Sequence, residues 1–307
     1  MTAYIIRRLL LLIPVLIIVA VIVFSLVHLT PGDPTSAMLG REASAEDKAA
    51  LREELGLNKP VIEQFIDWSW GAMRLDFGDS LFIRKPVTEA MLDRAEPTGL
   101  LTLYSLIFAL AVAIPSGVIA AMRPNSMVDR LLMVTSISGA AIPSFFFGIL
   151  LMLLFAVRLG WLPSGGYNNI SEGFWDHFRY MIMPSIALGF SAAGLLARIV
   201  RSTMLDVLNQ DYIRTAHAKG LAERRVVRRH ALRNAMIPAM TVIGIMLANM
   251  LGGAVVIETV FNIPGMGRLL VQSVVRRDFP VVQAAVLVVA VIEVLVMLFI
   301  DIMYVFI

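Results

Sequence analysis

Long apolar runs alternate with short charged segments along the whole chain. Six of these runs are apolar enough to cross a bilayer: Leu9–Leu29 and residues 98–121, 131–157, 180–197, 234–260 and 281–301. A helix needs roughly 20 apolar residues to cross about 30 Å of hydrocarbon, so each run predicts one membrane-spanning helix. We therefore expect an all-α, polytopic integral membrane protein with six transmembrane helices.

The first apolar run could also be the core of a signal peptide, because Arg7 and Arg8 precede it. The run is longer than the roughly 7 to 15 apolar residues of a signal core. The sequence TPGDP that follows it has no cleavage site of the small-x-small kind. Residues 1–30 are thus predicted to hold a cytoplasmic N-terminus and a retained first transmembrane helix.

Residues 31–96 form the only long polar segment of the chain. Residues 30 to 96 contain 8 Lys or Arg against 13 Asp or Glu, a net charge of −5. Positive charge is favoured on the cytoplasmic side of a membrane, so this acidic segment is predicted to lie outside. Ser44 as N-cap, the acidic residues after it and Gly56 as C-cap predict a helix within it. We interpret residues 31–96 as a partly helical extracytoplasmic loop that forms a lid.

Basic residues mark the opposite side of the membrane. Arg123 and Arg130 flank the turn after the second run, whereas Trp161 and Tyr167 after the third run suit an aromatic interface belt. Residues 198–233 contain 9 Lys or Arg against 3 Asp or Glu, the strongest orientation signal in the chain. These biases predict that both termini are cytoplasmic.

The composition agrees with a membrane protein, because 58% of the residues are hydrophobic and the mean hydropathy is +0.80. The absence of Cys excludes disulfides, thiolate metal sites and a thiol nucleophile. No G-x-x-x-x-G-K-[ST] motif occurs, so we expect no ATP hydrolysis by this chain. The spacing of the four histidines, His28, His177, His217 and His230, predicts no metal site. Most cations lie next to spans, which disfavours nucleic-acid binding.

An ion-coupled carrier is an alternative function, and it would need ionisable groups at mid-depth in several spans. Glu293 lies twelve residues into the sixth run, and Asp301 lies eight residues further on and on about the same helix face. The second to fifth runs contain essentially no such group. A packing role for Glu293 and an interfacial role for Asp301 are favoured. An intramembrane enzyme is disfavoured, because no nucleophile has a base at a reachable depth.

Small residues are frequent in the fourth and fifth runs, and those of the fifth include Gly244, Ala248, Gly252 and Gly253. Small residues let helix backbones approach closely, so helix packing is the favoured interpretation. A path for a solute is the alternative.

An outer gate is predicted after the fifth run. Glu258 lies at its outer end, and Pro264, Gly265 and Gly267 are expected to prevent a regular helix there. Irregular backbone at a membrane edge is stable only when it packs on protein or lines a wet cavity. We expect Glu258, Asn262, Pro264, Gly265 and Gly267 to form the gate, with an ordinary surface loop as the alternative.

The basic segment predicts a short helix that lies flat under the membrane. Asn209 or Asp211 is expected to cap a helix from Tyr212 to Lys219, which ends at Gly220, and a second helix then leads into the fifth run. Ala216, Ala218 and Gly220 are expected to leave backbone accessible, and Arg214, His217 and Lys219 to offer charge to a partner. On charge alone, a positive-inside anchor and a docking helix are equally good interpretations.

Beyond Gly220 the predicted helix contains like-charge pairs four residues apart, Arg224 with Arg228 and Arg225 with Arg229. Such pairs cost a few tenths of a kcal/mol each unless anions face them. Lipid phosphates or an acidic partner surface would supply these anions.

The sequence RTAHAKG, followed after nine residues by HALRNAMIP, resembles the cytoplasmic loop signature of ATP-binding-cassette (ABC) importer permeases. That signature is E-A-A, three residues, G, nine residues and I-x-L-P. Thr215, Ala216 and Gly220 occupy their expected places, and Arg214 replaces the Glu. The residues His230, Ala231 and Leu232 match I-x-L, and Arg233 stands where Pro is usual. These departures are similar to those of the peptide-importer branch.

Further marks of this branch lie along the whole chain: RRLLLLIPVL, HLTPGDP, LGWLPSGGY and VFNIPGMGRLL. The chain is identified as similar to the first permease subunit of dipeptide, oligopeptide, glutathione and nickel importers. Relatives continue past the D-x-x-Y that Asp301 to Tyr304 match into a short polar tail, where this sequence has VFI.

The resemblance implies a type I ABC importer permease fold and a transport subunit rather than an enzyme. Residues 97–307 would form a core of five transmembrane helices with a cytoplasmic coupling loop at 198–236. The coupling helix would consist of Arg214, Thr215, Ala216, His217, Ala218, Lys219 and Gly220, seated in a cleft of an ATPase.

The implied partners are a second homologous permease subunit, two ATP-binding cassette ATPase subunits, an extracytoplasmic substrate-binding protein and the lipid bilayer. The implied solute is a peptide such as a dipeptide, oligopeptide or glutathione, and the implied location is the bacterial inner membrane. No cofactor or metal is expected on this chain, since ATP and Mg would be used by the ATPase subunits.

Overall fold

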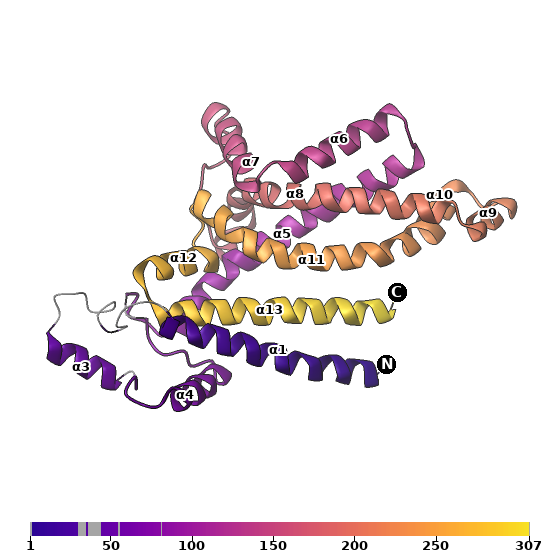
Figure 1. Ribbon diagram of the computed structural model, residues 1–307. Coiled ribbons are helices and arrows are strands. Elements are labelled where there is room, and N and C mark those ends of the chain that lie inside the picture. The colour runs from indigo at the N-terminus through magenta and orange to yellow at the C-terminus, as the bar shows by residue number, and fades with distance from the viewer. Residues whose placement is uncertain (1, 30–34, 36–43, 55, 81, 307) are drawn as a thin grey trace. The chain divides into compact units, whose positions relative to one another are not determined.

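The computed structural model describes residues 2–29, 35, 44–54, 56–80 and 82–306. Nearly all of these residues are helical, and the extended structure among them is an isolated bridge between Asp79 and Pro86. Two compact units are present (Figure 1): residues 1–96 with 265–295 form the first unit, and residues 97–264 with 296–307 form the second. The all-α prediction is confirmed.

Five helical stretches are long and apolar enough to cross a membrane. They are α1 (Thr2–Leu29), α5 (Val87–Met122), α8 (Phe174–Leu208), the continuous stretch Glu223–Val260 that contains α11 (Leu232–Val260), and α13 (Phe279–Phe306). A sixth span is obtained when two bent helices are counted together. The structure therefore agrees with a polytopic membrane protein of five to six spans.

The third predicted span is not one helix, and that part of the prediction is wrong. It is divided into α6 (Met127–Ala141) and α7 (Ser144–Leu151), and α7 continues as a π-helix, η1 (Met152–Arg158). The two halves are bent by 105°. Ile142 is extended, with φ −83° and ψ 124°, because the ring of Pro143 disfavours the helical conformation for the residue before it.

The second span begins earlier than predicted. Helix α5 starts at Val87, eleven residues before the expected start at residue 98, and it contains Pro97 and Pro115. The prediction ended the polar segment at residue 96 and began the span at Thr98, because the run from there contains no charged residue. Spanning helices tolerate proline where neighbouring helices satisfy the freed backbone groups.

Helix α8 is the centre of the second unit and packs against α6, α7 and α11. Close approach depends on glycine: a Cβ added to Gly194 would lie 2.3 Å from the carbonyl oxygen of Ser136 on α6. A Cβ added to Gly189 would lie 2.6 Å from the carbonyl oxygen of Ser105 on α5. These glycines of the fourth run therefore serve helix packing, as favoured from the sequence.

The glycines of the fifth run differ from one another. A Cβ on Gly244 would lie 2.0 Å from Cδ1 of Ile300, and one on Gly253 would lie 3.1 Å from Cδ1 of Leu188. A Cβ on Gly252 would meet nothing within 4 Å. Packing thus explains two of these three positions.

Replacing Gly194 by Ala is expected to destabilise the chain by about 1–3 kcal/mol, because the new methyl group overlaps backbone that cannot move cheaply. Gly252→Ala is the matched control, since it adds the same methyl group to a helix where space is open. Thermal unfolding of the purified protein in detergent measures the difference. Equal melting temperatures for the two variants would contradict the close packing at Gly194.

The first unit has a small core of its own. Val87 and Met91 of α5 pack with Met266 and Leu269 of α12 (Met266–Arg276) and with Val281 of α13. The side-chain amide of Gln283 on α13 donates hydrogen bonds to the carbonyl oxygens of Val23 (3.3 Å) and Phe24 (3.4 Å) on α1.

The predicted helix in the polar segment is present as α3 (Ala45–Glu54). The hydroxyl oxygen of Ser44 accepts the backbone N–H of Asp47 at 3.0 Å, so Ser44 is the N-cap. Gly56 follows with a left-handed φ of +64°, and the N–H groups of Gly56 and Leu57 donate to the carbonyls of Glu53 and Arg52. Both predicted caps are confirmed.

Candidate functional site

The predicted short helix in the basic segment is α9 (Asp211–Ala218), which follows α8 directly. Its bounds differ by one residue at each end from the predicted helix. Neither Asn209 nor Asp211 is the N-cap. Asn209 ends α8 in a helical conformation, and Gln210 is the N-cap without a side-chain hydrogen bond. The prediction was wrong because Asn209 belongs to the end of the preceding helix.

Gly220 ends α9 with a left-handed φ of +76°. The N–H of Gly220 donates to the carbonyl of His217 at 2.9 Å, and the N–H of Leu221 donates to the carbonyl of Ala216 at 3.3 Å. This pair of bonds closes a helix end that favours glycine, because other residues strain in the left-handed region. The predicted role of Gly220 as the stop is confirmed.

Helix α9 has one face in the core of the second unit and one face exposed. Ile213 (1% exposed) and Ala216 (7% exposed) belong to the core. The exposed residues of the predicted coupling set are Arg214, Thr215, His217, Ala218, Lys219 and Gly220. The expectation that Ala216 leaves backbone accessible is wrong, because the residue as a whole is only 7% exposed and packs into the core. The structure thus gives α9 a buried anchor and an exposed polar surface.

Side chains on α9 connect it to its neighbours. The hydroxyl of Tyr212 accepts a hydrogen bond from the side-chain amide of Asn234 on α11 at 2.8 Å. Arg214 forms an exposed ion pair with Asp211 at 3.3 Å. The imidazole of His217 lies 3.7 Å from the Glu223 carboxylate. The Tyr212 hydrogen bond and the buried side chains of Ile213 and Ala216 therefore hold α9 in a defined position relative to the start of α11.

The basic run after Gly220 is not the regular helix that was predicted. It starts as α10 (Glu223–Arg225) and continues as a π-helix, η3 (Val226–Ala231), before α11 begins. The side chains of Val226 and Val227 are buried, and the four arginines of the run, Arg224, Arg225, Arg228 and Arg229, are exposed. A π-helix has a wider turn than an α-helix, so residues four apart do not stack as expected.

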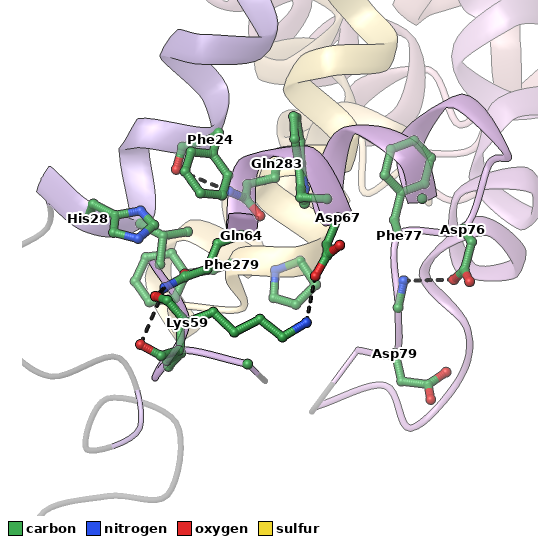
Figure 2. Close-up of a pocket in the computed structure, with 17 residues that line it drawn as sticks. Phe24, His28, Lys59, Gln64, Asp67, Asp76, Phe77, Asp79, Phe279 and Gln283 are labelled. Atoms are coloured by element: carbon green, nitrogen blue, oxygen red, sulfur yellow. Dashed lines mark hydrogen bonds and ion pairs between the residues drawn. The ribbon is translucent and has the colours of Figure 1, made fainter. Parts of the chain in front are cut away.

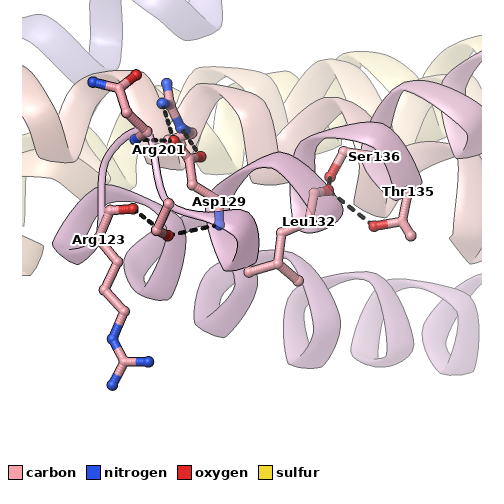
Figure 3. Close-up of polar contacts among 8 residues, drawn as sticks. Arg123, Asp129, Leu132, Thr135, Ser136 and Arg201 are labelled. Carbon is pink, nitrogen blue, oxygen red and sulfur yellow. Dashed lines mark hydrogen bonds and ion pairs between the residues drawn. The ribbon is translucent and has the colours of Figure 1, made fainter.

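A buried ion pair connects the start of α6 to α8 (Figure 3), and sequence reasoning missed it. The Nε of Arg201 donates to one oxygen of Asp129 and its Nη2 to the other, both at 2.6 Å. The Asp129 side chain is 4% exposed and that of Arg201 is 25% exposed. The same carboxylate accepts the N–H of Asn125 at 2.9 Å.

The local turn places Asp129 at this position. The hydroxyl of Ser126 caps α6 by accepting the N–H of Asp129 at 3.2 Å, and it donates to the carbonyl of Arg123 at 2.7 Å. Arg201 lies two turns before the end of α8, and α9 follows. The ion pair therefore connects the turn between α5 and α6 to the helix that leads into α9. Nothing in a single sequence pairs two charges 72 residues apart.

The predicted outer-gate residues are divided between the two units. Glu258, Asn262 and Pro264 belong to the second unit, and Gly265 and Gly267 belong to the first. Gly267 lies in the first turn of α12, so the expectation that it prevents a regular helix is wrong. A glycine in a helix costs only about 1 kcal/mol relative to Ala, which the tertiary packing of α12 offsets. The gate formed by all five residues stays a prediction.

The end of α11 is held tightly within the second unit. Glu258 is fully buried and its carboxylate accepts a hydrogen bond from the hydroxyl of Thr98 at 2.5 Å. Asn262 takes a left-handed φ of 55° that ends the helix. The ring of Phe261 is buried, and its carbonyl accepts the N–H of Gly166 at 2.8 Å. Irregular backbone here packs on protein, as predicted for a membrane edge.

The other ionisable candidates occupy separate places. Glu293 is half-buried on the part of α13 that belongs to the first unit, and Asp301 is half-buried on the part that belongs to the second. Within the described ranges no group of three or more His, Asp or Glu side chains could hold a metal ion. His177 is buried, and its ring nitrogen Nδ1 donates to the carbonyl of Asn168 at 2.7 Å.

Comparison with known proteins identifies the family. Residues 113–307 match the family described as binding-protein-dependent transport system inner membrane component, and residues 1–102 match the N-terminal part of such membrane components. The chain belongs to this family. It is a permease subunit of an ABC importer, and ATP hydrolysis is the task of separate subunits.

Relatives match the permease over almost its entire length. It is 45% identical over 304 residues to the glutathione transport system permease protein GsiC of Salmonella typhimurium, which covers 99% of this chain and 97% of that protein. The identity to GsiC of Escherichia coli strain K12 is 44% over the same length. This family supports the importer and not the ion-coupled carrier that relied on Glu293.

A solved structure shares the fold. The inward-facing MetNI methionine ABC transporter matches with a TM-score of 0.57 at 21% identity, over 70% of this chain and 94% of that chain. The ABC permease fold predicted from the sequence is confirmed. The permease is thus a multi-pass inner membrane protein, and an importer of this kind works with ATPase and substrate-binding protein partners.

Proposed function

We propose that this permease translocates a peptide-like solute, such as glutathione, a dipeptide or an oligopeptide, across the bacterial inner membrane. The relatives named for glutathione transport support this solute class. The permease would pair with a second homologous permease subunit, so that the solute path lies between the two. The proposed assembly also contains two ATPase subunits and one extracytoplasmic substrate-binding protein.

We propose that energy enters through α9. The observation that carries this proposal is the division of α9 into a buried anchor, Ile213 and Ala216, and an exposed face that ends at Gly220. A rigid-body movement of the ATPases would move this exposed face. Because the anchor lies in the same core as α8 and the start of α11, the movement passes to both spans without passing through a flexible linker.

The proposed orientation places both termini, α9 and the Arg123–Arg130 turn in the cytoplasm. The basic excess of residues 198–233 supports this orientation. Residues 31–96 then lie outside as a lid, and the end of α11 with its buried Glu258 lies at the outer side, where we propose the gate.

Transport by reconstituted protein tests this function. The permease is co-expressed with the proposed ATPases, second permease and binding protein, and the complex is inserted into liposomes. ATP-dependent uptake of radiolabelled glutathione or a dipeptide is expected, with no uptake when the ATPases are omitted. Uptake by this chain alone, driven by a proton gradient, would contradict the proposal.

A further inference from the structure

Helix α4 (Val61–Met73) of the first unit has an exposed apolar stripe. Ile62 (75% exposed), Ile66 (58%), Trp70 (54%) and Met73 (71%) form it. Their spacing of four, four and three residues places all four on one face of a helix. No side chain of α4 is fully buried. Such a stripe on a membrane protein needs an occupant, since contiguous apolar surface is rarely left in water.

The opposite face of α4 carries polar side chains among others and lines a cavity (Figure 2) of about 480 Å³. Gln64, Asp67, Trp68 and Gly71 contribute from α4 to this cavity. The ammonium of Lys59 lies 2.6 Å from the Asp67 carboxylate, and this hydrogen bond raises the pKa of Lys59. The ion pair therefore lies on the side of α4 opposite the stripe, together with the aromatic rings of Phe65 and Trp68 that contact α1, and the exposed Glu63 lies at the edge of the stripe.

Contacts with α1 determine the depth of α4 relative to a membrane. The ring of Phe24 on α1 lies 5.4 Å from that of Phe65 and 5.8 Å from that of Trp68. Phe24 is five residues before Leu29, the end of the apolar span of α1. At 1.5 Å per residue this contact lies roughly 7–8 Å below the end of the span. Helix α4 is thus held at the boundary between acyl chains and headgroups.

Length and flanking residues favour a position along the membrane surface. Thirteen residues extend only about 20 Å, too short to cross about 30 Å of hydrocarbon. The guanidinium of Arg74 lies 4.6 Å from the centre of the Trp70 ring at the end of α4. Tryptophan and arginine are typical of the interface, where an aromatic ring and a phosphate are both within reach.

We propose that α4 is an interfacial helix, which inserts Ile62, Ile66, Trp70 and Met73 into the phospholipid surface at which α1 ends. The opposite face then turns away from the lipid toward the cavity. The contact anchors α4, and with it this part of the proposed lid, to the bilayer. The inference depends on the span of α1 and not on which solute is carried.

Spin labelling tests this position, and the absence of Cys in the chain makes it direct. Single Cys residues are introduced as Ile62→Cys, Ile66→Cys and Met73→Cys, with Asp67→Cys on the opposite face as the control. The partner subunits carry Ser in place of any Cys. The labelled complex is studied in nanodiscs of phosphatidylethanolamine and phosphatidylglycerol, and accessibility to oxygen is compared with accessibility to a water-soluble nickel chelate.

Labels at 62, 66 and 73 are expected to be more accessible to oxygen than to the nickel chelate, with the reverse at 67. Greater accessibility to the nickel chelate at all four positions would place α4 in water and overturn the inference. Exclusion of both reagents at 62, 66 and 73 would also overturn it, because a protein partner would then cover the stripe. ATP-dependent uptake by the labelled complexes is a separate readout, so failure here is distinguishable from failure of the proposed function.

Discussion

The variant Gly220→Trp is expected to insert into the membrane normally and to lose uptake while the ATPases still turn over ATP. Uptake per ATP is expected to fall about 10-fold or more, which corresponds to at least about 1.4 kcal/mol in the barrier of the coupled step. The physical reason is twofold: the left-handed φ of +76° strains Trp and most other residues with a Cβ, and an indole would obstruct the exposed face of α9. Parallel assays of ATP hydrolysis and solute uptake in proteoliposomes measure the ratio.

Two variants separate conformation from contact. Gly220→Asn is the control for backbone strain, because Asn tolerates the left-handed region, and it is expected to retain most of the coupling. Arg214→Glu is expected to uncouple as well, since Arg214 is 75% exposed on the face proposed to dock. Arg228→Glu reverses the same charge on the basic run outside α9 and is expected to have a smaller effect. Unchanged uptake in both Gly220→Trp and Arg214→Glu would exclude α9 as the docking element.

Removing either partner of the ion pair between Asp129 and Arg201 is expected to destabilise the permease by about 3 kcal/mol. Breaking a buried pair typically costs about 3–5 kcal/mol because the remaining charge is left without a partner. The lower end of this energy range applies, since the Arg201 side chain is 25% exposed and water partly screens its charge. Asp129→Ala also removes the acceptor for the Asn125 N–H. Thermal unfolding of the purified complex in detergent measures the loss.

A double-mutant cycle identifies the pair as the cause. The variant with both Asp129→Leu and Arg201→Leu is expected to be less destabilised than the sum of the two single variants, because no charge stays buried. Arg198→Leu removes an exposed arginine three residues earlier on α8, and it is expected to be close to neutral. Additive effects in the cycle would mean that the two side chains stabilise the fold independently.

The C-terminal end of α9 was predictable because local interactions determine it, whereas its N-cap was not. Gly220 takes the left-handed conformation without strain, and the hydrogen bonds that close the helix end lie within five residues along the chain. Ser44 and Gly56 at the ends of α3 are the same case. The apolar runs also predicted five of the six spans as continuous helices, because the hydrocarbon thickness is the same for every helix that crosses it.

In some segments the apolar pattern predicted a continuous helix while a proline or glycine predicted a break. There, packing decided whether the helix continued. Pro97 lies inside α5 and Pro143 separates α6 from α7, although the sequence around each is apolar on one side or both. Only the neighbours of each proline decide whether the freed backbone groups are satisfied within a helix. The same holds for Gly267, which the sequence placed in an irregular segment and the fold placed in α12.

The sequence by itself determined the class of the protein, the approximate spans, the stop of α9 at Gly220 and the family to which the motifs belong. Tertiary structure alone decided that Asp129 meets Arg201, that Ala216 faces inward and that the two faces of α4 differ in their surroundings. The reason is that composition and capping act within a few residues along the chain. A contact between residues far apart in the sequence depends on how the helices are rotated relative to one another. Side-chain packing determines this rotation, and the periodic pattern of one helix does not predict it.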